Sequence, residues 1–194
     1  PYTVRKARVV VREMAESTAL DLLDKRMVTD QLVLTIGYDT ASLSNEDART
    51  TYKGEVTTDY YGRKVPKHAH GTANLESPTS SARLISEAVM ELFDRIVNPN
   101  LLVRRINLTT NHVVDEDTAA KNQSPVQYDL FTDYEALERK QREEKERLAK
   151  ERKIQTAILN IKKQFGKNAI LKGLNYEEGA TAKERNEQIG GHKA

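Results

Sequence analysis

Side chains suited to binding phosphate recur at alternating positions of three segments that the sequence predicts to be strands. They carry hydroxyl, amide, imidazole, ammonium or guanidinium groups, and none is a carboxylate: Thr35, Lys67, His68, His70, Thr72, Asn74, Arg105, Asn107 and Thr109. Residues two apart on a strand project to the same side, so we expect these groups to share one sheet face. Donors and positive charge suit phosphate oxygens, whose contacts hold a nucleic-acid backbone without reading its sequence. An ordinary solvated face has a similar composition, so both interpretations stay open.

Two members of this set, His68 and His70, have a spacing that also suits a metal ion. The sequence offers no third ligand beside them, and a polar strand face explains the pair equally well. The chain has no cysteine, which excludes disulfides and thiolate metal sites. Gly166 and Lys167 lack the glycine spacing of a phosphate-binding loop. We find no catalytic constellation and expect neither a metal nor another cofactor in this chain.

The elements that would position these residues alternate between helix and strand. Apolar residues recur at helical spacing over 4–26 and 80–97, and they alternate with polar residues over 31–39, 64–75 and 101–113. Residues 40–63 predict a long hairpin-like excursion, and SPTSS before the second helix supplies N-cap candidates. The predicted inward residues of the last strand are Leu102, Ile106 and Leu108. In the first helix they are Val9, Val10, Met14, Ala15, Ala19, Leu20, Leu22 and Leu23.

This order predicts an α+β fold over 1–113, with two helices on one face of an antiparallel sheet. A strand ahead of Pro1 would complete a βαββαβ pattern, so we expect the first strand to be missing. The chain begins at Pro1 without an initiator methionine, which favours a fragment or a processed piece.

Three further segments follow the predicted domain. Residues 114–132 predict a linker, and 133–165 predict a charged helix with a capping box at Thr132 and Glu135. That helix gains an apolar stripe late, at Ile154, Ile158, Ile161 and Phe165. The stripe is expected to dock on the domain or on a second copy of the chain, by self-association through 154–165. The tail, 166–194, is expected to be irregular.

Large apolar side chains interrupt the polar linker just before this helix. The peptide is Gln127, Tyr128, Asp129, Leu130 and Phe131. An extended segment of this kind suits a partner with deep pockets for a few side chains, here Leu130 and Phe131, with Gln127 bonding at the rim. A local staple, in which Phe131 packs back on Leu137 or on the domain, explains the pattern equally well.

Composition bears on which functional classes and cellular locations suit this protein. The 194 residues are 31% charged, with a net charge of +2 and a mean hydropathy of −0.69. A net charge this small does not by itself identify a nucleic-acid binder. No run of 18 apolar residues and no signal peptide are present, so a cytoplasmic location is expected.

Several segments resemble, in the same order, the C-terminal little finger domain of Y-family translesion DNA polymerases, in the UmuC/ImpB/MucB/SamB branch. They are ARVVVREMAESTALDLL, TIGYD, YYGRKVPKHAHGTANL, PTSSARLISEAVMELFDRI and LLVRRINLTT. The tail is similar to the end of Gram-positive members known as UV-damage repair proteins. Residues 127–131 resemble the sliding-clamp-binding peptide Gln-x-(Ser/Asp)-Leu-Phe of bacterial polymerases, and all four defining positions match.

The resemblance implies that the open sheet face grips the backbones of template and primer DNA. It places Arg105 of the Arg104–Arg105 pair on phosphate, and it makes Arg63, Lys64 and Lys67 further contacts. Thr109 stands where many relatives have a basic residue, so that contact is expected to be weaker. The parent would be a nucleotidyltransferase used in DNA repair, whose Mg²⁺-binding palm domain precedes this segment and is absent from this chain.

Two alternatives belong to other classes. One is a free-standing, non-catalytic regulator that binds DNA or competes for the clamp. The other is an RNA-binding or ribosome-associated protein, because βαββαβ sheets also serve that role. Such sheets usually expose stacking aromatic residues on the open face, where this sequence predicts His68 and His70 but no Phe or Tyr.

Overall fold

The computed structural model describes residues 1–44, 52–121, 134–189 and 192–193, with side chains through Gln188. In chain order the elements are α1 (Val4–Asp24), β1 (Met27–Tyr38), the 3₁₀ helix η1 (Thr40–Leu43), β2 (Val56–Thr58), β3 (Lys64–Pro66), β4 (Ala69–Thr79), α3 (Ala82–Ile96), β5 (Val103–Asn111), β6 (Val114–Asp115), α4 (Glu116–Lys121), α5 (Tyr134–Phe165), the 3₁₀ helix η2 (Gly173–Tyr176), α6 (Ala182–Asn186), β7 (Gln188–Ile189) and β8 (His192–Lys193).

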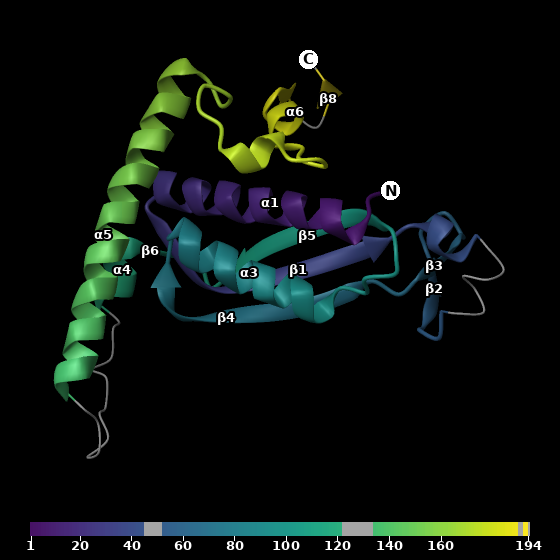
Figure 1. Ribbon diagram of the computed structural model, residues 1–194, viewed down its shortest axis with the longest axis horizontal. Coiled ribbons are helices and arrows are strands. Elements are labelled where there is room, and N and C mark those ends of the chain that lie inside the picture. The colour runs from purple at the N-terminus through teal and green to yellow at the C-terminus, as the bar shows by residue number, and fades with distance from the viewer. Residues whose placement is uncertain (45–51, 122–133, 190–191, 194) are drawn as a thin grey trace.

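The main sheet is antiparallel, in the order β4-β1-β5, with β6 pairing the first residues of β1. Helices α1 and α3 lie side by side over one face of this sheet (Figure 1). The prediction of an antiparallel α+β fold with helices packed on the sheet is therefore confirmed. Tyr2 forms a single antiparallel bridge with Val103 on the outer edge of β5. The second sheet, β2-β3, is a small hairpin beyond the end of β1 (Figure 1).

The core lies between this sheet and the two helices, and strand alternation produces it. Its fully buried members include Leu32, Leu34 and Ile36 of β1 and Ile85, Val89 and Phe93 of α3. Helix α1 contributes mostly alanines, which let it approach closely. Helix α3 begins where predicted, because the Ser81 hydroxyl accepts a hydrogen bond from the N–H of Leu84. Gly71 of β4 lies under α3, where a Cβ would stand only 2.7 Å from Leu92.

The predicted inward face of the last strand was wrong at its start. Val103 is buried, whereas Leu102 is only half-buried. The register between β1 and β5 shifts at this point, from Gly37–Arg105 to Tyr38–Val103. The extra residue, Arg104, forms a β-bulge that resets the alternation, so Val103 and Ile106 both face the helices.

The predicted strand over 64–75 is two strands in different sheets. β3 pairs with β2 in the hairpin, and β4 then joins the main sheet and continues to Thr79. The break follows Pro66, which has no N–H to donate to a ladder. Arg63 and Lys64 therefore belong to the hairpin, and Lys67 and His68 form the junction between the two sheets.

The predicted stripe of α1 was shifted. Ala7 and Val11 are buried, whereas Val9, Val10, Met14 and Leu20 are only half-buried. The helix is covered from a second side by the C-terminal segment, which runs over α1 (Figure 1). That segment is more regular than expected, since it contains η2 and α6. Lys6 pairs with Glu178 of this segment, at 2.7 Å.

Helix α5 contacts the domain through polar residues that were not predicted, while only part of its apolar stripe is half-buried. Its Glu151 carboxylate accepts hydrogen bonds from the Ser81 hydroxyl (2.7 Å) and from the N–H of Arg83 (2.8 Å). The side chain of Gln155 is buried, and its Nε2 donates to the carbonyl of Ser80 (3.2 Å). These contacts satisfy the first turn of α3.

The four residues of the apolar stripe of α5 differ in exposure. Ile158 and Ile161 are half-buried, but Ile154 is 61% exposed and Phe165 is 68% exposed. Docking on the domain, one of the two predicted partners of the stripe, therefore does not include Ile154 and Phe165. Self-association through 154–165 stays a prediction.

Candidate nucleic-acid interface

The open face of the main sheet is organised in rows that cross its three long strands. Thr35 of β1 lies opposite His70 of β4 on one side and Asn107 of β5 on the other. The next two rows are Thr72–Val33–Thr109 and Asn74–Gln31–Asn111. The outer members of the first two rows are exposed, and no row contains a carboxylate. The structure thus brings together the predicted residues of β1, β4 and β5 on one face.

Hydrogen bonds along two of the rows, between neighbouring strands, hold side chains of this face in place. Asn111 Nδ2 donates to Gln31 Oε1, and Gln31 Nε2 donates to Asn74 Oδ1, each at 2.9 Å. The Thr35 hydroxyl and His70 Nδ1 share a hydrogen bond of the same length. His70 and Asn74 are both exposed, so the polar atoms that these bonds do not use are available to a ligand. Gln31 and Asn111 were not among the predicted site residues, although alternation places them on this face.

Arg105 stands at the end of the face, opposite Gly37 of β1. A Cβ built on Gly37 would lie 3.2 Å from the Cβ of Arg105, so the glycine leaves room for this side chain to lie across the strand. Arg105 is exposed and has no ion pair or hydrogen-bond partner among the described residues. Its guanidinium is therefore a free cation beside rows that contain no carboxylate. Sequence reasoning missed Gly37, whose only signal is a glycine inside a strand.

The neighbouring arginine serves the fold instead. The bulge turns Arg104 toward Asp39, whose buried carboxylate lies 2.8 Å from its Nη1. The same carboxylate accepts a hydrogen bond from the N–H of Ala41 (2.8 Å). The Ala41 N–H first, and then the Arg104 guanidinium, hold the pKa of Asp39 below its usual value. Of the two consecutive arginines, only Arg105 has no partner among the described residues.

The hairpin cations differ in how far they are neutralised. Lys67 pairs with Glu55, and Arg63 pairs with Asp59, both at 2.6 Å. Lys64 donates to the hydroxyl of Thr58 (2.9 Å), which is neutral and leaves the lysine charge uncompensated. Among these three predicted contacts, Lys64 is the freest cation. Lys67 and His68 are exposed at the junction and lie outside the rows of the main sheet.

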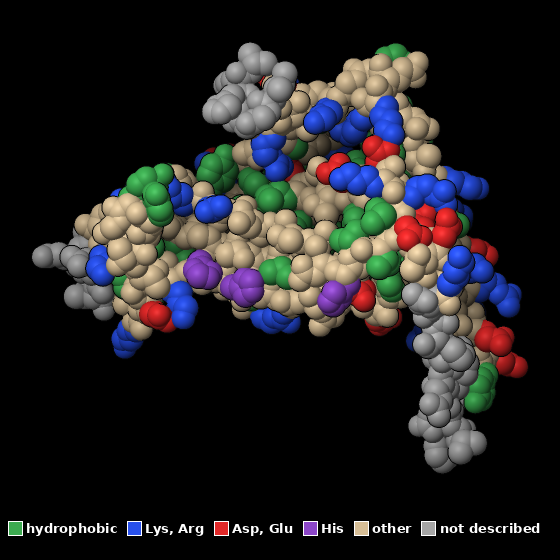
Figure 2. All heavy atoms as spheres, turned by 180° about the vertical axis from the view of Figure 1, so that it is seen from behind, with side chains coloured by type: hydrophobic (Ala, Val, Ile, Leu, Met, Phe, Trp, Pro, Cys, Tyr) green, Lys and Arg blue, Asp and Glu red, His purple; other side chains and the backbone are tan. Residues whose placement is uncertain are grey.

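Figure 2 shows the side of the molecule that faces away from the two helices, with histidine side chains (purple) following one another along it. The histidines whose side chains are described are His68, His70 and His112. His112 Nδ1 lies 2.9 Å from a carboxylate oxygen of Asp30, so it is held at the far end of the sheet. Within the described ranges, no three His, Cys, Asp or Glu residues form a group able to hold a metal ion.

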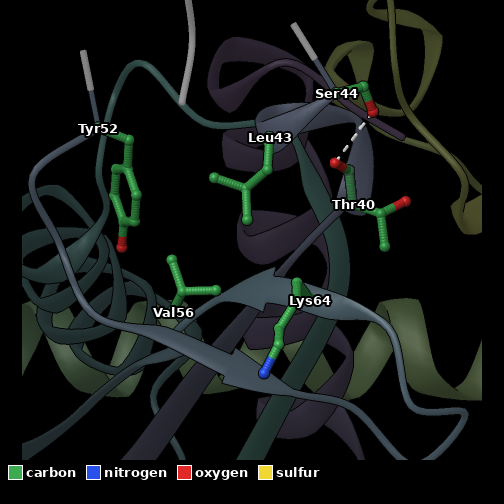
Figure 3. Close-up of a pocket in the computed structure, with 6 residues that line it drawn as sticks. All are labelled: Thr40, Leu43, Ser44, Tyr52, Val56 and Lys64. Carbon is green, nitrogen blue, oxygen red and sulfur yellow. Dashed lines mark hydrogen bonds between the residues drawn. The ribbon is translucent and has the colours of Figure 1, made fainter. Parts of the chain in front are cut away.

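A pocket of about 490 Å³ lies between η1 and the root of the hairpin (Figure 3). It is lined by Thr40, Leu43, Ser44, Tyr52, Val56 and Lys64. The Ser44 hydroxyl donates to the carbonyl of Thr40 (3.2 Å), and the Tyr52 hydroxyl donates to the carbonyl of Glu55 (3.2 Å). These groups stabilise the turn and hold the hairpin in place. The lining contains no pairing of a nucleophile with a base.

Two further expectations from the sequence concern the linker peptide and membrane insertion. The peptide Gln127, Tyr128, Asp129, Leu130 and Phe131 lies outside the described residues, so clamp binding stays a prediction. None of the helices in the described part of the chain is long and apolar enough to cross a membrane.

Comparison with known families decides the identity of this domain. The model of the impB/mucB/samB family C-terminal domain matches residues 2–130. The chain belongs to this family. Its domain is the little finger of Y-family DNA polymerases, and the match runs from Tyr2 through all strands of the main sheet. No curated protein matches the chain. The little finger is a domain that contacts DNA in this family, which makes the open sheet face the first candidate for that contact.

Proposed function

We propose that this chain is the DNA-binding and clamp-tethering C-terminal portion of a Y-family polymerase that acts in translesion synthesis and DNA repair in the cytoplasm. Its sheet face holds the backbone of template–primer DNA, and its linker peptide attaches to a sliding clamp. Nucleotide transfer with Mg²⁺ belongs to the palm domain of the parent enzyme. The observation that carries the proposal is the unpaired Arg105 beside carboxylate-free rows on the open sheet face of a family little finger.

The chemistry of the face favours backbone contacts over base reading. Hydroxyls and amides such as Thr72 and Asn107 donate to phosphate or sugar oxygens, and Arg105 supplies charge. The cations are few, so binding should be weak and independent of sequence, and it should weaken with salt. The alternative of an RNA-binding sheet is disfavoured, because the rows of the open face contain no Phe, Tyr or Trp, and His70 is the one aromatic ring in them.

The DNA contact is tested by replacing Arg105 with alanine and measuring the affinity for duplex DNA over a range of salt concentrations. We expect a severalfold loss for every sequence and a salt slope smaller by about one. Arg142→Ala on exposed helix α5 removes the same charge elsewhere and serves as the matched control. A change of base preference at one position, or an equal loss in the control, would contradict a backbone grip by this face.

The clamp contact is tested by titrating a sliding clamp with the parent chain and with the double variant Leu130→Ala, Phe131→Ala. Burial of these two side chains in a pocket contributes roughly 3–6 kcal/mol before ordering costs, which fits a micromolar affinity. We expect the double variant to lose clamp binding and to keep its fold and DNA affinity. Clamp binding equal to that of the parent would favour the local staple instead.

A further inference from the structure

The tip of the β2–β3 hairpin exposes two adjacent tyrosines. Tyr60 is 96% exposed and Tyr61 is 77% exposed. Their ring centroids lie 5.4 Å apart in an edge-to-face arrangement, so the rings point in different directions and each keeps a face open to solvent. Two large aromatic residues side by side in water contribute nothing to the core of this protein. Their placement calls for a ligand.

The turn that carries the tyrosines is held rigidly by Asp59. Its Oδ1 accepts hydrogen bonds from the N–H of Tyr61 (3.0 Å) and of Arg63 (2.9 Å), and its Oδ2 accepts one from Arg63 Nε (2.8 Å). The N–H of Gly62 donates to the Asp59 carbonyl (3.0 Å), and Gly62 has φ = 78°, which favours glycine. A preorganised turn loses little conformational entropy when a ligand binds its side chains.

The net charge beside these rings is positive, because Lys64 adds a cation to the mutually neutralised pair of Arg63 and Asp59. The Arg63 guanidinium lies 5.2 Å from the centroid of Tyr61, over one face of the ring. Lys64 follows on β3 with its charge uncompensated by a carboxylate. Aromatic rings interleaved with cations suit a single nucleic-acid strand, because unpaired bases stack on the rings while the cations meet the backbone. An anionic strand is therefore favoured over a protein surface of unspecified charge.

The hairpin also lies at the end of the sheet where Arg105 stands. It stands beyond the C-terminal end of β1 (Figure 1), the end at which Gly37 and Arg105 face each other. The junction residues Lys67 and His68 connect the hairpin with β4 on the same side. A DNA strand held on the open face and leaving it past Arg105 therefore runs toward the tyrosines.

We propose that Tyr60 and Tyr61 form a stacking platform for unpaired bases of single-stranded DNA adjoining the duplex on the sheet face. This inference rests on the proposed DNA-binding function and adds a second, single-strand site to it. The duplex offers the tyrosines no open base face except at its end, so the platform acts where the DNA becomes single-stranded.

The test compares the affinities of the full chain for blunt duplex and for the same duplex with a single-stranded overhang containing 2-aminopurine. The double variant Tyr60→Ala, Tyr61→Ala should bind the overhang DNA about ten- to a hundredfold more weakly and should no longer quench 2-aminopurine fluorescence. Its affinity for blunt duplex should change less than twofold. The double variant Tyr60→Phe, Tyr61→Phe keeps the rings and should behave like the parent. Tyr176→Ala removes an exposed tyrosine from the tail and serves as the matched control.

The outcomes separate this inference from the function on which it rests. Equal affinity of parent and double-alanine variant for the overhang DNA would overturn the platform, while Arg105-dependent binding of blunt duplex would keep the proposed function. An equal loss on both DNAs would also overturn it, since the hairpin would then contact the duplex backbone. If the parent chain bound neither DNA, the proposed function itself would fail. An unchanged unfolding curve of the variants establishes that the fold is intact.

Discussion

The two sides of the little finger use polar side chains in opposite ways. On the helix side, α5 and the C-terminal segment are held on the domain by charged groups that have partners within this chain, such as Glu151 and Glu13. On the open side of the sheet, Arg105 has none among the described residues, and its neighbours bond only to other neutral groups. The difference teaches that the presence of charge does not identify a binding face. Arg142 of α5 also has no partner among the described residues; the open face differs because its unpaired cation stands beside aligned rows of exposed donor groups.

Glu13 of α1 is the clearest case on the helix side. Its carboxylate is buried and accepts hydrogen bonds from Asn175 Nδ2 (2.8 Å) and from the N–H groups of Thr181 (2.9 Å) and Ala182 (3.0 Å). Arg185 Nη2 lies 3.3 Å from the same group. A buried carboxylate is tolerated only when its oxygens are satisfied in this way. The C-terminal segment is therefore held on α1 by one residue that collects donors from η2 and α6.

Removing the Glu13 carboxylate should release the C-terminal segment from α1. Glu13→Ala leaves several donors and Arg185 without their acceptor, and we expect the unfolding free energy to fall by about 2–4 kcal/mol. The amides of residues 174–186 should lose protection in hydrogen exchange, while DNA affinity stays near that of the parent. Glu178→Ala removes only the exposed partner of Lys6 and is the matched control, with a much smaller expected effect. Protection of the segment unchanged in Glu13→Ala would show that other contacts hold it.

The same comparison explains what sequence patterns could and could not predict. Alternation placed Arg105, Asn107 and Thr109 on the open face, because the strand is regular beyond the bulge. It failed at Leu102, since a bulge depends on the pairing of β1 with β5 and has no local signal. Helical periodicity found α5 but not its docking surface, because Glu151 and Gln155 bind the first turn of α3 from far along the chain.

A second prediction concerns the ion pair between Arg104 and Asp39. The pKa of Asp39 is lowered in the folded state, so its contribution to stability is present above its ordinary value of 3.8 and is lost as the pH falls through the lower folded value. Asp39→Asn should reduce stability at neutral pH, because it weakens the contact with Arg104. The stability gap between parent and variant should stay constant down to about pH 5 and shrink below about pH 4. Denaturation curves recorded at several pH values measure this gap, and a gap that widened in acid would contradict the assignment.

The variant with the smallest expected effect changes the position of Arg105 on the open sheet face but not its charge. Gly37→Ala puts a methyl group 3.2 Å from the Cβ of Arg105, so the arginine side chain must shift although its charge is unchanged. We expect the affinity for duplex DNA to fall about two- to threefold, because phosphate contacts depend on where the guanidinium lies, while the salt slope stays nearly that of the parent. Gly173→Ala is the matched control, since a Cβ there meets nothing within 4 Å. Binding unchanged by Gly37→Ala, together with a loss in Arg105→Ala, would mean that Arg105 acts through charge alone and that its position over β1 is not used.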